Sequence, residues 1–353
     1  MRAKARPSSR PAPAAPASAN GHRRTEALDP ELRRRLLRGM LRIRMVEEEI
    51  ARRYPEQEMR CPVHLSIGQE GVAVGVCSAL EERDYALSAH RAHAHYLAKG
   101  GGLKAMLAEM YGRRTGCAGG KGGSMHLVDP AANMLGAVPI VGGSIPIAVG
   151  AAFASWMKGE DRVTAVFLGD GATEEGVFAE SLNFAALKSL PVLFICENNL
   201  YSVYSPLSVR QAPGRDRLAL ARAHGMEARE ADGNDVEAVY RLTLEAAGRA
   251  RRGEGPAYLE FSTYRWLEHC GPNYDNDAGY RSEEEFASWR AQCPVLRQQA
   301  LLESGGLLAA EHLAALKREL ASEIEEAFAF AKASPYPAPS ELMTDVYADG
   351  PRD

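Results

Sequence analysis

The chain has 353 residues, of which 46% are hydrophobic and 25% are charged, and its formal net charge is −4. This composition can bury the core of one large α/β domain or of two smaller ones, and the small net charge gives no reason to expect nucleic acid or an anionic membrane as a partner. No apolar run reaches the roughly 18 residues of a membrane span. The six cysteines include no Cys-x-x-Cys pair, which argues against a disulfide framework or a zinc site and favours reduced thiols in a cytoplasm.

The two ends of the chain differ in composition from its middle. Residues 1–24 are rich in Pro, Ala, Ser and Arg and contain no acidic residue, so we expect a disordered tail. A transit peptide shares this character, but the prolines oppose the amphipathic helix of such a peptide. We expect one α/β domain over residues 25–333 and a proline-rich tail over residues 334–353.

A histidine, His64, lies between the first two predicted helices. One runs from Asp29, a predicted N-cap, to about Tyr54, because apolar residues recur there at helical spacing. A second helix, of small residues, ends at about Leu80. His64 stands just before that second helix, where it could transfer a proton at the edge of a site. A hydrogen-bonded structural histidine is the other interpretation.

Three histidines cluster at positions 90, 93 and 95, around an arginine. A metal site is disfavoured there, because these spacings do not share one helix face and no carboxylate or cysteine accompanies them. Arg91 is the stronger candidate, since a guanidinium can hold phosphate oxygens with two parallel hydrogen bonds.

Two glycine-rich segments follow. The segment from Gly116 to His126 (GCAGGKGGSMH) is predicted to be a loop, either a flexible link or the lining of a site. Val141 then lies in Ile-Val-Gly-Gly, ahead of a helix of small residues from Ile147 to Met157. Small residues allow a close approach of backbone and neighbouring helices.

The central stretch, Arg162 to Tyr201, predicts a strand, a helix that opens near Thr173, and a second strand. The first strand ends in Gly-Asp-Gly at Asp170 and the second in Glu-Asn-Asn at Asn199. Such crossovers are nearly always right-handed, and parallel strands end at the same edge of a sheet. The two side chains are therefore predicted to be neighbours.

A carboxylate and an amide oxygen beside a helix N-terminus suit Mg²⁺ together with a diphosphate. Gly171 would let backbone amides approach that anion. The glycine spacing fits neither the dinucleotide fingerprint nor the P-loop. Gly-Asp-Gly alone would also suit an ordinary turn, but its pairing with Asn-Asn favours a site. Residues 200–213 are predicted to form an irregular loop.

The rest of the chain continues the alternation of strands and helices. A strand before Asp232, a helix to about Arg251 and a strand from Ala257 to Ser262 predict a doubly wound parallel sheet with helices on both faces. The next loop, which carries His269, lies at the carboxyl edge. Two helices, residues 283–291 and 307–332, complete the prediction.

Gly-Asp-Gly followed by Asn-Asn is similar to the thiamine-diphosphate motif. The wider sequence, from about His64 to Tyr280 and again over residues 339–347, resembles the alpha subunits of two-chain 2-oxo acid dehydrogenases of the pyruvate, branched-chain and acetoin type. This resemblance implies the diphosphate-binding half of the thiamine-diphosphate fold, with thiamine diphosphate and magnesium as cofactors. It also implies an alpha2beta2 heterotetramer, in which the beta subunit supplies the glutamate that activates the cofactor.

The resemblance assigns roles to individual residues. His64 and His269 match the active-site histidines of the family. The metal ligands are the side chains of Asp170 and Asn199 and the carbonyl of Tyr201. The full set of implied cofactor contacts is His90, Arg91, Val141, Asp170, Gly171, Ala172, Asn199, Tyr201 and His269.

The sequence differs from the pyruvate type at three positions in or near these site residues. His90 replaces a tyrosine, Leu267 stands where a first histidine is common, and Cys270 replaces the serine that animal enzymes phosphorylate. Phosphorylation at that position is therefore not expected.

The implied reaction is decarboxylation of a pyruvate-like 2-oxo acid and transfer of the acyl unit to a lipoyl-bearing acyltransferase. The unusual loop after Trp266 leaves open a transferase that moves a two-carbon unit from a keto acid or ketose to a sugar or to the thiol of an acyl carrier protein. A non-catalytic assembly subunit is a third possibility, although the presence of Arg91, Asp170 and His269 weighs against it.

Overall fold

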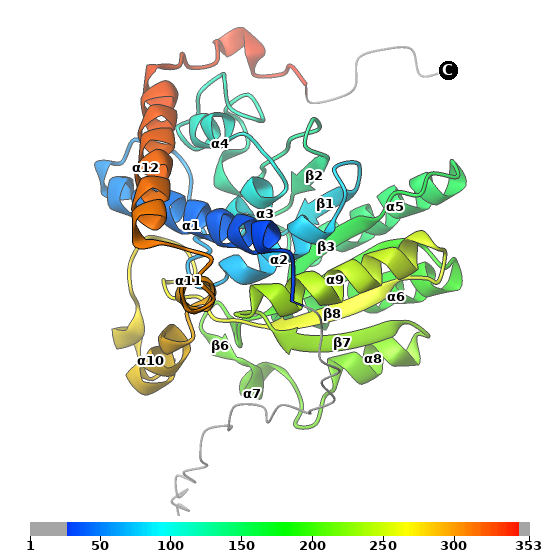
Figure 1. The fold of residues 1–353 in the computed structure, drawn as a ribbon. Coiled ribbons are helices and arrows are strands. Elements are labelled where there is room, and N and C mark those ends of the chain that lie inside the picture. The colour runs from blue at the N-terminus through cyan, green and yellow to red at the C-terminus, as the bar shows by residue number, and fades with distance from the viewer. Residues whose placement is uncertain (1–26, 346–353) are drawn as a thin grey trace, which may run out of the picture.

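The computed structural model describes residues 27–345 (Figure 1). The predicted disordered tail, residues 1–24, lies outside this range, as does the end of the C-terminal segment. None of the helices in the range combines the length and the apolar character that crossing a lipid bilayer requires.

Within the described residues, six strands form one parallel sheet in the order β2-β1-β3-β4-β8-β7. The strands are β1 (Tyr85–Ser88), β2 (Met134–Ala137), β3 (Thr164–Gly169), β4 (Val192–Asn198), β7 (Glu227–Asp232) and β8 (Ala257–Ser262). The chain moves from β1 outward to β2, returns to β3 on the other side of β1, continues to β4, passes to β7 at the far edge, and ends in β8 between β4 and β7. This reversal of strand order is the topological switch of a doubly wound sheet, so the predicted fold class is confirmed.

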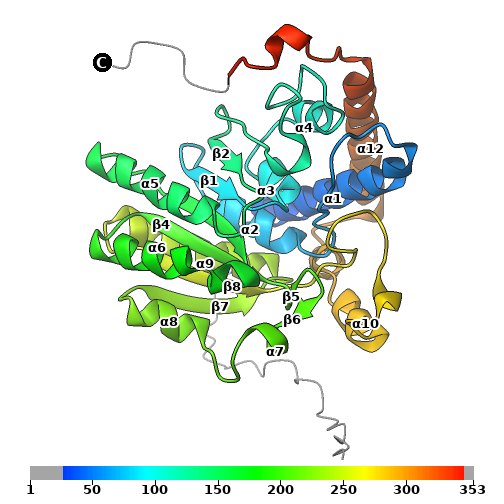
Figure 2. The ribbon, with the colours of Figure 1, turned by 180° about the vertical axis from the view of Figure 1, so that it is seen from behind.

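Helices cover both faces of this sheet. They are α1 (Pro30–Arg53), α2 (Glu70–Ala79), α3 (His93–Ala98), α4 (Leu103–Met110), α5 (Ser144–Met157), α6 (Gly176–Leu187), α7 (Leu207–Arg210), α8 (Arg217–Ala223), α9 (Val236–Arg251), α10 (Glu283–Ala291), α11 (Pro294–Ser304) and α12 (Ala310–Ala333). Figure 1 shows α9, α2 and α1 in front of the sheet, and Figure 2 shows α5, α6 and α8 on the opposite face.

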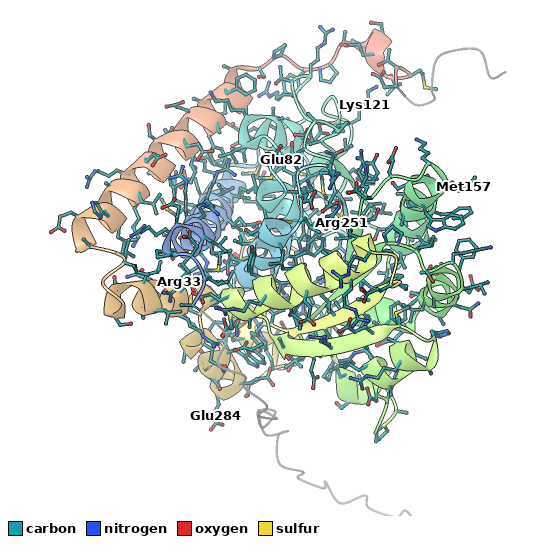
Figure 3. All side chains as sticks on the ribbon, turned by 45° about the vertical axis from the view of Figure 1, so that its right-hand side comes forward. Arg33, Glu82, Lys121, Met157, Arg251 and Glu284 are labelled. Atoms are coloured by element: carbon teal, nitrogen blue, oxygen red, sulfur yellow. The ribbon has the colours of Figure 1, made fainter. Side chains whose placement is uncertain are left out.

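The alternation of side chains along β3 explains the two layers. Ala165 and Phe167 pack into one buried cluster with residues of α1, α2 and α9, whereas Val166 and Leu168 pack into a second cluster with residues of α5, α6 and α8. Successive side chains of a strand point to opposite faces, and every residue of β3 before Gly169 is buried. Side chains fill the space between the sheet and both helical layers (Figure 3).

Most predicted elements are confirmed, and their ends have local causes. The Asp29 side chain accepts hydrogen bonds from the backbone N–H groups of Glu31 and Leu32, at 2.9 and 3.1 Å, and thus caps α1 as expected. Strand β8 and helix α10 have the predicted bounds. Strands β1 and β2 and helices α3, α4, α8 and α11 were not predicted.

Two predictions around the central motif were wrong. The α-helix after β3 begins at Gly176 rather than near Thr173, because a 3₁₀ turn from Asp170 to Glu174 comes first. Residues 200–213 are not wholly irregular either. They form a small antiparallel hairpin of β5 (Tyr201–Ser202) and β6 (Ser205–Pro206), followed by the single turn of α7.

A buried ion pair connects helix α1 to helix α2. The Arg44 guanidinium donates two hydrogen bonds to the Glu70 carboxylate, at 2.6 and 3.0 Å, and lies over the Trp266 ring at 4.2 Å. The same carboxylate accepts the backbone N–H of Gly68 at 3.2 Å, so it also orders the chain that enters α2. This pair therefore fixes the segment that carries His64.

We predict that Glu70→Gln destabilises the protein by about 3 kcal/mol, because removing one partner of a buried pair leaves an uncompensated buried charge. Urea unfolding measures the loss. Glu319→Gln is the matched control, since Glu319 pairs with Arg38 in solvent at 2.8 Å. An equal effect of the two substitutions would contradict this account.

Candidate active site

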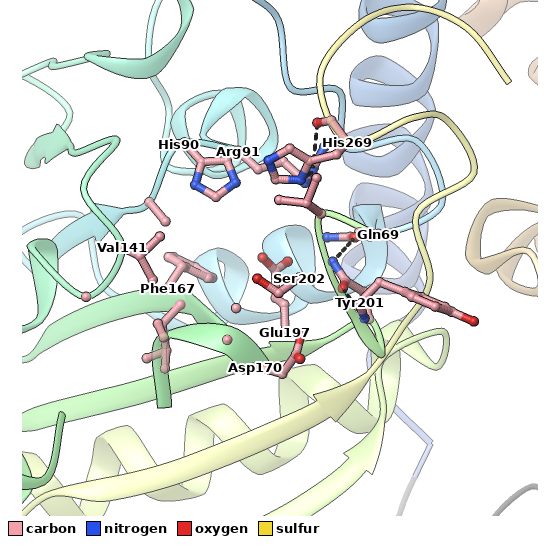
Figure 4. Close-up of a pocket in the computed structure, with 18 of the residues that line it drawn as sticks. Gln69, His90, Arg91, Val141, Phe167, Asp170, Glu197, Tyr201, Ser202 and His269 are labelled. Carbon is pink, nitrogen blue, oxygen red and sulfur yellow. Dashed lines mark hydrogen bonds between the residues drawn. The ribbon is translucent and has the colours of Figure 1, made fainter. Parts of the chain in front are cut away.

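A pocket opens at the carboxyl edge of the sheet, close to the switch between β1 and β3 (Figure 4). Segments that follow β1, β2, β3, β4 and β8 all contribute to its lining. The nine predicted cofactor-contacting residues, at positions 90, 91, 141, 170, 171, 172, 199, 201 and 269, all line this pocket. His64 does not line it but contacts two of the lining histidines.

The register of two strands places the predicted metal ligands. Gly169 of β3 pairs with Glu197 of β4, so Asp170 and Asn199 both leave the sheet at the same edge. Both side chains are buried. The Asn199 amide is held by two neighbours: its nitrogen donates to Gln69 Oε1 at 3.0 Å, and its oxygen accepts the Tyr201 backbone N–H at 3.2 Å.

Arg210 lies at this position too, although no sequence pattern predicts it there. Its guanidinium donates to the carboxylates of Asp170 and Glu174. Burial raises the pKa of Asp170, and the Arg210 guanidinium acts in the opposite direction. The turn of α7 brings this arginine back to the sheet edge, so the wrong prediction of an irregular loop concealed it.

The donors here fit a magnesium ion and a diphosphate. A guanidinium already balances the buried Asp170 carboxylate, which shows that this position holds a positive charge. Carboxylate and amide oxygens are ligands that Mg²⁺ prefers. Gly171 has no side chain, so an anion can approach its backbone. A Cβ at this position would lie 3.0 Å from Ser202 Oγ and would fill that space.

Arg91 is buried at the opposite side of the pocket. It donates to the backbone carbonyl of Leu65 at 2.7 Å and to that of His269 at 3.1 Å. Burial lowers the pKa of Arg91 to about 10. Arg91 thus joins the segment before α2 to the loop after β8, besides facing the pocket.

Three imidazoles meet beside Arg91. The ring centroids of His64 and His90 are 4.8 Å apart, those of His64 and His269 5.0 Å, and those of His90 and His269 5.2 Å. Burial, together with the positive charge of Arg91, lowers the pKa of His64 to about 2, of His90 to about 4 and of His269 to about 3. All three are neutral at pH 7.

The other two histidines of the 90–95 cluster do not join this group of three rings. His93 Nδ1 lies 3.1 Å from Glu47 Oε1, and its Nε2 lies 2.6 Å from Ser124 Oγ. His95 Nδ1 lies 2.7 Å from Ser88 Oγ, and the ring stacks on Phe167. His93 therefore fixes the glycine-rich loop, and His95 supports the pocket floor.

One carboxylate organises that loop. Glu109, which is buried, accepts the backbone N–H groups of residues 118 and 120 at one oxygen, both at 2.8 Å, and those of residues 122 and 123 at the other, at 2.6 and 3.0 Å. At the tip of the loop, Lys121 donates to the carbonyl of Thr344 at 2.6 Å (Figure 3). The loop is therefore ordered, not a flexible link.

Fold and site together define an α/β enzyme with a polar pocket at the carboxyl edge of a parallel sheet. Residues 38–340 match the family described as "Dehydrogenase E1 component". The chain belongs to this family, whose members are thiamine-diphosphate-dependent components of 2-oxo acid dehydrogenases.

Several relatives are similar over most of their length. The alpha subunit of acetoin:2,6-dichlorophenolindophenol oxidoreductase from Bacillus subtilis is 39% identical over 312 residues, which cover 87% of this chain and 91% of that protein. The corresponding subunit from Cupriavidus necator is 38% identical, covering 91% and 95%. A chloroplastic pyruvate dehydrogenase E1 component subunit alpha-3 from Arabidopsis thaliana is 37% identical, covering 89% and 74%.

We predict that Glu109→Gln accelerates amide hydrogen exchange over residues 118–123 at least about tenfold, because each lost bond to a charged acceptor is worth about 1.5–3 kcal/mol. Exchange followed by mass spectrometry measures this. Glu326→Gln, on the exposed face of α12, is the control. Unchanged exchange in the Glu109 variant would show that the carboxylate does not order the loop.

We also predict that stability falls as the pH drops below about 6.5. His64, His90 and His269 have lowered pKa values in the folded chain. Between pH 6.5 and about 4 the unfolded chain therefore binds more protons than the folded chain, and unfolding is favoured. The thermal midpoint, measured from pH 7.5 to 5, tests this. His64→Gln flattens the slope, whereas His312→Gln, at an exposed site, leaves it unchanged; equal slopes in all three proteins would contradict the prediction.

Proposed function

We propose that the chain is the alpha subunit of a 2-oxo acid dehydrogenase that decarboxylates a pyruvate-like 2-oxo acid. The observation that carries this is the meeting of a buried, cation-paired carboxylate, Asp170, with the Asn199 amide in one pocket. Membership of the E1 family supplies the cofactor, thiamine diphosphate.

In this proposal magnesium takes the place of the Arg210 guanidinium on Asp170. The oxygen of the Asn199 side chain and the carbonyl of Tyr201 are its other protein ligands. Gly171 and Ala172 present backbone groups to the diphosphate, and Arg91 adds a positive charge to the pocket. The Val141 backbone and the His90 ring lie along the remaining wall, where the rest of the cofactor would extend (Figure 4).

When bound, thiamine diphosphate supplies the nucleophilic carbon and the electron sink of the decarboxylation. The chain contributes proton acceptors and exclusion of water. His64 Nδ1 is buried and has no hydrogen-bond partner among residues 27–345, and a neutral ring nitrogen can take or return a proton. His269 Nδ1 lies 3.5 Å from the Arg91 guanidinium, which keeps this ring neutral and directs its lone pair.

A beta subunit completes the proposed enzyme. The relatives are named as alpha subunits, and this chain exposes large apolar side chains at Ile140, Val141, Ile147 and Met157, next to the pocket and along α5. Exposed apolar patches of this kind mark interaction surfaces. We propose an alpha2beta2 assembly in a cytoplasm, consistent with six free cysteines.

The proposed acceptor is the lipoyl group of an acyltransferase. The alternative acceptors are a carrier-protein thiol or a sugar, with a keto acid or ketose as the donor. The loop after β8 bears on this choice: Leu267 is buried, and Glu268 turns back to accept the Asn273 backbone N–H at 2.9 Å, so this loop gives the pocket mouth its own shape.

We predict that Asp170→Asn weakens binding of thiamine diphosphate and magnesium to the alpha–beta complex at least about 100-fold, since even indirect supports of a metal site are worth 10–100-fold. Calorimetric titration measures the affinity. Asp161→Asn, at an exposed position, serves as the control. Unchanged cofactor affinity would refute the metal role, and no cofactor binding by the unaltered complex would favour a non-catalytic assembly subunit.

We predict that the complex acylates a lipoyl domain when given a short 2-oxo acid. Parallel reactions replace the acceptor by an acyl carrier protein or a sugar phosphate, and the donor by a ketose phosphate; mass spectrometry identifies the acylated product. If only the carrier protein or the sugar were acylated, the proposed dehydrogenase function would be wrong and the transferase function would take its place.

A further inference from the structure

Three histidines at and beside the pocket, His64, His90 and His269, lie close enough together to hold a metal ion. Ligand atoms of His64, His90 and His269 all lie within 4.8 Å of one another. Each comes from a different segment: one before α2, one after β1 and one after β8. This group shares only His90 with the set at positions 90, 93 and 95 that lies together in the sequence.

His64 provides an independent sign of a ligand. Its side chain is only 7% exposed, yet Nδ1 has no hydrogen-bond partner among the described residues. A buried polar atom without a partner is costly and rare. A metal ion between the rings would satisfy it.

The required adjustment is small. Zinc binds imidazole nitrogen at about 2.0–2.1 Å, so tetrahedral coordination needs nitrogen atoms about 3.4 Å apart. The ligand atoms lie within 4.8 Å of one another, so the side chains of His90 and His269, which line the pocket, would have to turn toward His64 to reach that spacing. The rings are already neutral, as coordination requires.

The positive charge of Arg91 and the imidazole ligands determine which metal ions this site favours. Arg91 is a fixed positive charge 3.5 Å from His269 Nδ1, and it opposes any cation. A hard ion such as Mg²⁺, which prefers oxygen, would gain too little from imidazole to overcome it. An ion that forms strong bonds to imidazole, such as Zn²⁺, is favoured.

We propose that His64, His90 and His269 form a second metal site, which binds one zinc-class transition-metal ion through three imidazoles and leaves a fourth position open to the pocket. It is distinct from the magnesium position at Asp170, on the opposite side of the pocket (Figure 4). His90 is the residue that completes the set. Metal binding at these three histidines does not depend on the proposed function.

The test uses the full-length chain, stripped of metal by a chelator and kept in excess Mg²⁺. Titration with Zn²⁺ and with Co²⁺, which reports its ligands through visible absorption, measures affinity and stoichiometry. We expect one ion per chain, and at least about tenfold weaker binding in His64→Gln, His90→Gln and His269→Gln. His312→Gln, on the exposed face of α12, is the matched control and keeps full affinity.

Two further measurements keep the result independent of variant folding. X-ray absorption of the zinc-loaded natural chain is expected to show three imidazole nitrogens and no sulfur. Loss of binding in Cys270→Ser with retention in His90→Gln would instead place the ion on a thiol and overturn the proposal. Binding that no histidine substitution weakens, an adventitious ion only, would overturn it as well.

Discussion

The parallel pairing of β3 with β4 determines where everything else in the pocket lies. Because Gly169 is opposite Glu197, the chain leaves both strands at one edge, and Asp170 and Asn199 become neighbours although 29 residues separate them in the sequence. A shift of one residue would turn the buried side chains of β3 toward the opposite helical layer. Two separate cores, one on each face, therefore hold this register and with it the site.

The pocket divides into an acidic side and a side that carries Arg91 and its neighbouring histidines. Asp170 and Glu174 are balanced by Arg210 on one side, whereas three uncharged imidazoles surround Arg91 on the other. Burial causes both patterns, because a buried carboxylate needs a cation and a buried imidazole sheds its proton. In the proposed function, this arrangement separates anion and metal binding from proton transfer.

The sequence predicted what depends on local pattern and strand order. Strands β4 and β8, most helices, and the convergence of residues at the ends of β3, β4 and β8 follow from apolar runs and from the rule that parallel strands end together. It missed β1 and β2, which have only four residues each and too little alternation to read. Arg210 and the meeting of His64 with His90 and His269 could not be predicted, because tertiary packing alone brings these distant residues together.

The most direct test of this account is a crystal structure of the chain with its beta subunit, thiamine diphosphate and Mn²⁺ in place of magnesium. The anomalous signal of manganese locates the metal without reference to the proposed ligands. The account predicts one peak in contact with the Asp170 carboxylate, the Asn199 amide oxygen and the Tyr201 carbonyl, with Arg210 moved off Asp170. A diphosphate-bound manganese held by other residues, while Arg210 remains on Asp170, would contradict it.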